Sequence, residues 1–305
     1  MRQRVCILLS TFNGADFVSE QLDSLIGQSH RDLRIHVRDD GSSDESGQIL
    51  ARYARRNANF SVEFGSNLGA SESYFRLLLA ADSASDYFAF CDQDDVWHTD
   101  KIERAVTRLA GTSPDTPVIY CSRLQYVGQN LSPLSSSRLP HRGLSFQNAL
   151  VENVAVGCTL VMNRAARELI IERLPSQCVM YDWWCYLVVS AFGIVVYDDV
   201  PTINYRLHMG NTIGAAVSVW GQFGRRARRF ALKRRGAFSI HGQAAEFLNI
   251  FAERLPAREF EILSRFVESK RSIWRRIGYA VNPEVYRQSR LDGLLLRVLL
   301  LLDWY

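Results

Sequence analysis

The chain has 305 residues, of which 47% are hydrophobic, 22% charged and 11% aromatic, a composition that excludes a disordered protein. The net charge of +4 is unevenly distributed, because residues 216–305 carry 17 Lys and Arg against 8 Asp and Glu, whereas the remainder carries 19 against 24. No uncharged apolar run approaches the ~20 residues that span a bilayer, and the apolar run near the N-terminus is too short for a signal peptide.

Strand-like and helix-like segments alternate along the first third of the chain. Apolar runs at 5–11, 33–39, 60–65 and 86–92 predict strands, and segments of helical periodicity lie between them and again after Asp100. This alternation predicts an α/β fold in which a mostly parallel sheet is covered by helices on both faces.

The second part of the chain continues the sheet and then becomes helical. Further strands are predicted at 117–127 and 157–163 and after Gly193, a mobile loop at 128–143, and an apolar helix from Asp182. From residue 217 onward the pattern is helical. We therefore expect a catalytic domain at 1–215, divided into halves at 1–110 and 111–215, and a basic helical C-terminal region at 216–305.

Every predicted strand of the first half ends in small, polar or acidic residues. Such residues also make turns and helix caps, so one segment alone is ambiguous. Four polar strand ends together are harder to explain as turns alone. Ligands bind at the carboxyl ends of the strands in an open parallel sheet, so these ends predict a binding site. The four segments are "STFNG" (10–14), "DDGSSD" (39–44), "SNLGAS" (66–71) and "DQDD" (92–95).

The segment "DQDD" places three carboxylates in four positions. Unpaired carboxylates at this density repel each other, and a divalent cation relieves the repulsion. Carboxylate oxygens suit Mg²⁺ or Mn²⁺, which fill their other positions with water and phosphate oxygens. We therefore expect Asp92 and Asp94 to bind a metal. The alternative is a helix N-cap, which applies best to Asp95.

These motifs together resemble family 2 glycosyltransferases of the GT-A fold. The residues that carry the resemblance are "LLSTFNGADF", "RDDGSSDES", "GSNLGAS" and "FCDQDDVW". The later "YDWWCYLVVSAFG" and "YRLHMGNTIGA" resemble the rhamnosyltransferase-like branch. The resemblance covers about residues 1–215 and implies a nucleoside-diphosphate sugar as the donor.

The resemblance also implies roles for individual residues. The donor site would include Thr11, Phe12, Asn13, Asp39, Asp40, Asn67, Gly69, Asp92, Gln93 and Arg206, with Asp40 favoured over Asp39 for the pyrimidine contact. Asp94, with Asp92 and His208, would bind the metal. Asp182 would be the catalytic base, with Trp183 and Trp184 on the acceptor side. The alternative is that Asp182 caps its helix and the tryptophans fill the core. Tyr181 stands where this branch often has His.

The basic C-terminal region predicts contact with an anionic surface. "RRARRFALKRR" and the apolar "LLLRVLLLL" would hold the protein at the inner face of the plasma membrane, and a packing or dimer role is the alternative. No base-reading motif accompanies the basic run, so nucleic acid is not expected as a partner. The six cysteines form no CxxC pair, which favours reduced thiols in a cytoplasmic protein.

The sequence therefore predicts a metal-dependent inverting glycosyltransferase. The expected reaction transfers rhamnose from dTDP-rhamnose to a glycan or lipid-linked acceptor in bacterial surface polysaccharide synthesis. Transfer of galactose or glucose from a UDP-sugar is an alternative, as is a non-catalytic subunit that binds a nucleotide sugar. A nucleotidyltransferase is disfavoured because "STFNG" contains no Lys or Arg.

Overall fold

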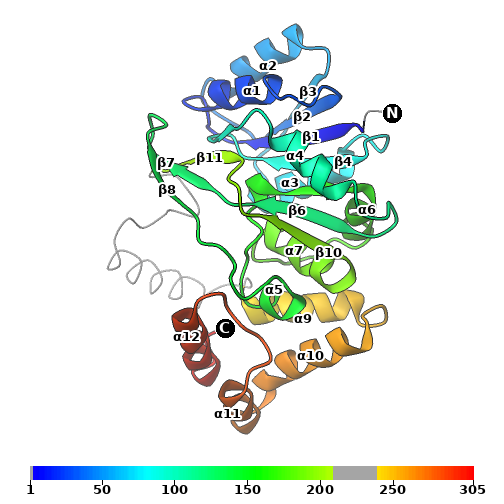
Figure 1. Ribbon diagram of the computed structural model, residues 1–305, viewed down its shortest axis with the longest axis vertical. Coiled ribbons are helices and arrows are strands. Elements are labelled where there is room, and N and C mark those ends of the chain that lie inside the picture. Colours follow the sequence, from blue (N-terminus) through cyan, green and yellow to red (C-terminus); the bar gives the residue numbers. More distant parts are fainter. Residues whose placement is uncertain (1–2, 209–238) are drawn as a thin grey trace. The chain divides into compact units, whose positions relative to one another are not determined.

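The computed structural model describes residues 3–208 and 239–305 (Figure 1). The chain divides into two compact units. The first consists of residues 1–139, 155–172 and 193–214, and the second of residues 140–154, 173–192 and 215–305. The basic run at 225–235 lies outside the described residues. Two segments expected in the sheet domain, 140–154 and 173–192, therefore group with the C-terminal helices instead.

The first unit is built on a seven-stranded sheet in the order β10-β6-β9-β4-β1-β2-β3. All neighbouring strands are parallel except β9, which runs antiparallel to both β4 and β6. The predicted mostly parallel sheet is therefore confirmed. Its strands are β1 (Val5–Thr11), β2 (Leu33–Asp39), β3 (Phe60–Phe64), β4 (Tyr87–Cys91), β6 (Val118–Ser122), β9 (Val161–Asn163) and β10 (Ile194–Asp198).

Helices cover both faces of this sheet, as expected. Residues 5, 7 and 9 of β1 share one buried cluster with the apolar sides of α1, α2 and α4. On the opposite face, Tyr74 of α3 contacts Phe90, and Arg167 of α6 lies over the Phe88 ring. Because both faces of the strands are buried, β1 and β4 are apolar along their whole length. The helices are α1 (Val18–Ile26), α2 (Ser46–Arg56), α3 (Ala70–Ala80), α4 (Lys101–Leu109) and α6 (Arg164–Glu172).

A second, four-stranded sheet has the order β5-β11-β7-β8. The strand expected at 117–127 is in fact two strands, because the chain leaves the main sheet after β6 and enters the second sheet as β7. The predicted loop at 128–143 contains a strand, β8, that pairs with β7. At 157–163, a 3₁₀ turn over Gly157–Thr159 precedes β9. The strands of the second sheet are β5 (Val96–Trp97), β7 (Gln125–Val127), β8 (Pro133–Ser136) and β11 (Ile203–Arg206).

The described part of the second unit is helical. Its core is aromatic: Trp184 of α7 packs against Phe247 and Phe251 of α9. The helical pattern expected for the C-terminal region is confirmed over the described residues. The helices are α5 (Phe146–Ala149), α7 (Tyr181–Phe192), α9 (Ile240–Phe251), α10 (Ala257–Glu268), α11 (Ile273–Val281) and α12 (Arg290–Leu301). No described helix is long and apolar enough to cross a membrane.

Candidate active site

The polar ends of the first four strands lie at one edge of the main sheet. Strand register pairs Thr11 with Asp39, and Asp39 with Phe64, so β1, β2 and β3 end side by side. On the other side of β1, Leu9 pairs with Cys91, which places the "DQDD" segment beside "STFNG". The chain order reverses at β1, between β2 and β4. This edge is the position where open α/β sheets bind ligands.

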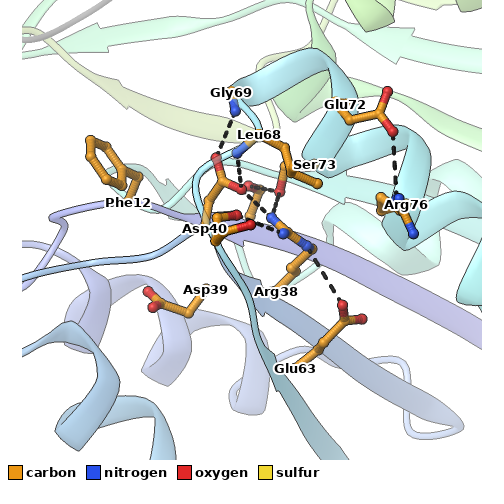
Figure 2. A network of polar contacts seen from close by, with 12 residues as sticks. Phe12, Arg38, Asp39, Asp40, Glu63, Leu68, Gly69, Glu72, Ser73 and Arg76 are labelled. Atoms are coloured by element: carbon orange, nitrogen blue, oxygen red, sulfur yellow. Dashed lines mark hydrogen bonds and ion pairs between the residues drawn. The ribbon is translucent and has the colours of Figure 1, made fainter.

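The buried Asp40 carboxylate binds hydrogen-bond donors of the protein itself. Its carboxylate accepts hydrogen bonds from the backbone N–H groups of Leu68 and Gly69, both at 2.9 Å, and pairs with the buried Arg38 guanidinium. Arg38 also donates to Ser73 and to the carbonyl of Ser66. Figure 2 shows the Asp40 side chain directed into this network. Asp40 therefore fixes the loop that leads into α3.

Asp39 points away from the Arg38 network (Figure 2). Its Oδ1 accepts hydrogen bonds from the hydroxyls of Thr11 and Ser42, at 3.0 and 2.5 Å, and its Oδ2 accepts one from the Ser42 N–H at 3.1 Å. Asp39 thus connects the ends of β1 and β2. Asp40 is paired with Arg38 and Asp39 is not, but both carboxylates are buried, so the contact of Asp40 with a pyrimidine stays a prediction and Asp39 is its alternative.

The loop after β1 is attached to the "DQDD" segment by one side-chain amide. Gln93 Oε1 accepts the Phe12 N–H at 2.8 Å, and Gln93 Nε2 donates to the Phe12 carbonyl at 3.1 Å. The amide passes so close to Gly14 that a Cβ there would collide with it. Gln93 is therefore occupied with the protein backbone, whereas the Phe12 ring is 45% exposed and free to contact a ligand.

Three further predicted donor-site residues lie in adjoining loops. Asn13 has a positive φ of 49° and accepts hydrogen bonds from the N–H and hydroxyl of Ser43. Its conformation is thereby fixed in the left-handed region. Gly69 has φ 81°, which favours glycine, and its N–H is one of the two that bind Asp40. Asn67 is exposed in the same loop. These residues order the loops that border the edge.

The three carboxylates of "DQDD" point to different partners. Asp92 accepts a hydrogen bond from the Tyr74 hydroxyl at 2.6 Å. Asp94 Oδ2 lies 2.7 Å from His208 Nε2, so the structure brings these two predicted metal ligands together. Asp95 is fully buried, and its Oδ1 accepts the Arg206 N–H at 3.1 Å. The helix-cap alternative for Asp95 is wrong, because α4 begins only at Lys101, after Asp100.

The second oxygen of Asp95 has a weak donor only. Its buried Oδ2 accepts no hydrogen bond from an N–H or O–H group of the described residues, whereas the Cys158 thiol is a hydrogen-bond partner of the Asp95 carboxyl. Burial, together with the charges of Asp94 and Asp92, raises the pKa of Asp95 well above its ordinary value. Ligand atoms of Asp92, Asp95 and Cys158 lie within 4.8 Å of one another, the sole group of three such side chains found in the described residues. Asp92 thus converges with Asp95 and Cys158, and not with Asp94 and His208.

This donor set fits a divalent cation. Three carboxylates crowd together here with the buried Lys101 as a neighbouring cation, and hard oxygen ligands suit Mg²⁺ or Mn²⁺. Cys158 does not suit these ions, and its pKa is raised well above the ordinary value by burial and by the neighbouring Asp95 and Asp92, so its thiol is protonated. The residues available to hold the cation are therefore the aspartates and His208.

Arg206 is buried, and protein atoms surround its guanidinium. It donates to the Asp94 carbonyl at 2.9 Å and also binds Glu20 and the Gln129 carbonyl. The guanidinium lies over the Phe17 ring, which also stacks on His208. These contacts hold the "DQDD" segment and His208 in place. The structure thus gives Arg206 a positioning role; direct contact with a diphosphate stays a prediction.

The predicted base and its neighbours lie in the second unit, in the first turn of α7. Asp182 is buried, and its Oδ1 accepts the Trp183 N–H at 2.7 Å. Trp183 donates its indole N–H to the Ala149 carbonyl at 2.6 Å. Trp184 is 0% exposed and packs in the aromatic core. Neither ring is available to stack on a sugar in this structure, so the expected acceptor-side role is replaced by packing.

Comparison with protein families identifies the family of the chain and the activity class of that family. Residues 6–170, more than half of the chain, match the sequence model of Glycosyl transferase family 2. The chain belongs to this family. Among curated relatives, the dTDP-rhamnosyl transferase RfbG of Shigella flexneri is 28% identical over 232 residues, which cover 71% of this chain and 77% of the relative. The family assignment drawn from the sequence motifs is therefore confirmed.

Solved glycosyltransferase structures share the fold. TarS 1–349 of S. aureus, in complex with UDP-GlcNAc, aligns with a TM-score of 0.61 at 14% identity and covers 98% of this chain and 82% of its own. The mannosyltransferase PcManGT of Pyrobaculum calidifontis, in complex with GDP-Man and Mn²⁺, aligns with a TM-score of 0.53 at 16% identity, covering 100% and 81%. At this identity the likeness shows the fold alone, and it confirms that this family 2 glycosyltransferase has the GT-A fold.

Several residues of the site were not found from the sequence. Arg38 lies two positions before Asp40, a spacing that puts both side chains on one face of a strand, and this signal could have been read. Tyr74 and Lys101 gave no signal, because their places beside the "DQDD" segment depend on how α3 and α4 pack.

Proposed function

We propose that this glycosyltransferase transfers a sugar from a nucleoside-diphosphate donor, with inversion, and needs a divalent cation for it. The crowding of Asp92, Asp94 and Asp95 supports this most directly, because the two neighbouring carboxylates raise the pKa of the buried Asp95, and a divalent cation would relieve their repulsion. The exposed Phe12 ring and Asp39, on the neighbouring strand ends, would hold the nucleoside of the same donor.

The residues divide the work by their chemistry. Asp94 and His208 would hold Mg²⁺ or Mn²⁺, with Asp92 and Asp95 adding negative charge, and the bound cation would offset the charge that develops on the diphosphate. Arg206 and Gln93 hold in place the loops that carry these site residues. An acceptor hydroxyl attacks the anomeric carbon, the bond to the diphosphate oxygen breaks, and the nucleoside diphosphate leaves with the electron pair. Asp182 takes the hydroxyl proton.

The donor that we propose is dTDP-rhamnose, and the acceptor is a glycan or lipid-linked oligosaccharide of a bacterial surface polysaccharide. The resemblance of the α7 segment to the rhamnosyltransferase-like branch supports this choice, as does the dTDP-rhamnosyl transferase among the relatives. A lipid-linked acceptor would place the enzyme in the cytoplasm at the inner face of the plasma membrane. A UDP-sugar donor is the alternative, and the UDP-GlcNAc complex of a protein with the same fold supports it.

A donor panel tests the proposal. The full-length protein is incubated with dTDP-rhamnose, UDP-sugars and GDP-sugars, a lipid-linked acceptor, and Mg²⁺, Mn²⁺ or EDTA, and release of nucleotide is measured. We expect release with one donor class, abolished by EDTA. Asp182→Asn should retain donor binding and lose transfer by roughly 10²- to 10⁴-fold. Binding of a nucleotide sugar without release under any condition would favour the non-catalytic alternative.

A further inference from the structure

The last two helices of the second unit expose an unusual amount of apolar surface. Of the 19 large hydrophobic residues that are exposed in the described chain, 10 lie between residues 273 and 304. Trp274 is 80% and Leu291 75% exposed. Isolated exposed apolar residues are ordinary, but a contiguous patch marks an interaction surface. The ten residues, called the apolar face below, are Ile273, Trp274, Ile277, Val281, Leu291, Leu294, Val298, Leu301, Leu302 and Trp304.

The apolar face follows the helical repeat. On α12, Leu291, Leu294, Val298 and Leu301 are three or four residues apart and form one stripe, while Leu296, Leu299 and Leu300 point into the unit. Helix α11 packs against α12 (Figure 1). On α11, Trp274, Ile277 and Val281 form a second stripe of the same spacing. Each helix therefore has a second apolar side that its own packing does not use.

Positive charge accompanies this face. Residues 269–305 contain seven Lys and Arg against three Asp and Glu, a net charge of +4. Arg290 lies four residues before Leu294, and Arg297 lies three after it, so both arginines border the α12 stripe. Neither forms an ion pair with a carboxylate of the described residues, and both are exposed. Asp292 lies on the opposite side of the helix from this stripe.

We infer that the α11–α12 pair docks on an anionic lipid bilayer, with the apolar face inserted among the lipid chains and Arg290 and Arg297 at the headgroups. Amphipathic helices that lie in the membrane interface combine an apolar stripe with bordering basic residues, and tryptophan is enriched at the level of the headgroups. Phosphate groups of anionic lipids supply the negative charge that the two arginines lack. A second copy of the chain would cover the apolar stripes but would not neutralise the positive charges of the two arginines. This inference rests on the proposed function in one respect only: docking would give the enzyme access to a lipid-linked acceptor.

Vesicle binding tests this inference without donor or acceptor. The full-length protein is sedimented with phosphatidylcholine vesicles, with and without phosphatidylglycerol, at low and high salt. We expect Trp274→Glu/Leu294→Glu to lower binding to anionic vesicles at least about tenfold, whereas Leu79→Glu, an exposed leucine of α3, should not. Arg290→Gln/Arg297→Gln should weaken binding at low salt, and Arg52→Gln/Arg55→Gln on α2 should not.

Two further measurements decide between the outcomes. If the Glu variant fails to fold, brominated lipids replace sedimentation, and their quenching of tryptophan fluorescence should fall in Trp274→Phe. The inference is overturned if the patch variants bind like the wild type, if the wild type binds no vesicles, or if light scattering shows that the patch variants only turn a dimer into a monomer. Nucleotide release with a soluble acceptor should be unchanged in all variants, so failure here is distinguishable from failure of the proposed function.

Discussion

Two acidic segments, one after β2 and one after β4, lie on either side of β1. Their buried carboxylates have different partners. In the segment after β2, Asp40 has an Arg38 partner and two backbone N–H donors. In the segment after β4, Asp95 has one backbone N–H donor and the weak Cys158 thiol, and it forms no ion pair with a described side chain. In the first segment the buried carboxylate is thus paired with a buried cation, whose Nε lies 3.7 Å from the Glu63 carboxylate. The second has three carboxylates close together and, among the described residues, no ion pair to Asp95, which is why we propose that a cation binds there.

The largest expected effect follows from removing the partly buried carboxylate of the second segment that contacts His208. Asp94→Asn should lower the rate of transfer roughly 10³-fold, because the charge that holds the cation opposite the leaving diphosphate is lost. Steady-state kinetics with the active donor measures this loss. Asp86→Asn is the matched control at the other end of β4, where Asp86 pairs with Arg164, and its rate should be near that of the wild type. Equal rates for both variants would remove Asp94 from the site.

Neutralising Asp40 should instead destabilise the fold. Asp40→Asn leaves the buried Arg38 guanidinium with only the half-exposed Glu63 carboxylate, 3.7 Å from its Nε, and breaking a buried ion pair in this way costs up to about 3–5 kcal/mol. Urea unfolding measures the change. Asp32→Asn, which breaks the partly exposed pair with Arg4, should cost no more than about 1 kcal/mol. If the two substitutions cost the same, the description of the first segment as a completed pair is wrong.

The comparison also shows which parts of the site the sequence could predict. The strands and their polar ends were predicted well, because an apolar run that stops at Asp39 or Asp92 marks both the element and its edge. The proximity of His208 to Asp94 came only from resemblance, because 114 residues separate them and no local rule joins them. The helix cap assigned to Asp95 failed because a short strand, β5, precedes α4.

Tertiary packing also overrode the reading of Trp184. Its place beside Asp182 suggested an acceptor site, but Phe247 and Phe251, some sixty residues later, enclose the ring. The same packing groups α7 with the C-terminal helices, although the sequence predicted it in the sheet domain. Contacts between distant aromatic residues leave no pattern in a single sequence, so burial of this kind can be found only in the structure.

Lys101 provides a sharper test of the second segment. This buried lysine contacts the Trp97 ring and the Thr159 carbonyl, and burial lowers its pKa to about 8 from 10.5, although the charge of Asp95 opposes the shift. Below pH 8 lysine is charged in both states, so the folded protein bears the whole penalty of the buried charge. That penalty disappears as the pH rises from 8 to 10.5, where only the unfolded state keeps the proton.

Lys101→Met should therefore stabilise the protein at pH 7 by on the order of 2 kcal/mol, after allowance for the lost ring contact, and the gain should vanish near pH 10. Urea unfolding at the two pH values measures it, and comparing variant with wild type cancels the titration of cysteines and tyrosines. A loss of stability at pH 7 would mean that Lys101 balances Asp95 as Arg38 balances Asp40, and the contrast between the two segments would disappear.

The smallest expected effect has the most informative sign. Asp95→Asn keeps the side-chain oxygen that accepts the Arg206 N–H. It removes the negative charge of a carboxylate whose second oxygen is buried. Because the pKa of Asp95 is raised by burial and by Asp94 and Asp92, the folded state binds its proton more tightly than the unfolded state does. This stabilisation is complete below the unfolded pKa of 3.8 and is lost as the pH rises through the folded pKa.

In metal-free protein, Asp95→Asn should thus be more stable than the wild type by about 1 kcal/mol at high pH, with no gain at acidic pH. Added Mg²⁺ or Mn²⁺ should raise the melting temperature of the wild type and raise that of the variant less, since a ligand stabilises only the state that binds it. The same Asp-to-Asn change would then destabilise the segment after β2 and stabilise the one after β4. Destabilisation by Asp95→Asn without metal would show that its second oxygen is already satisfied and that no cation is needed there.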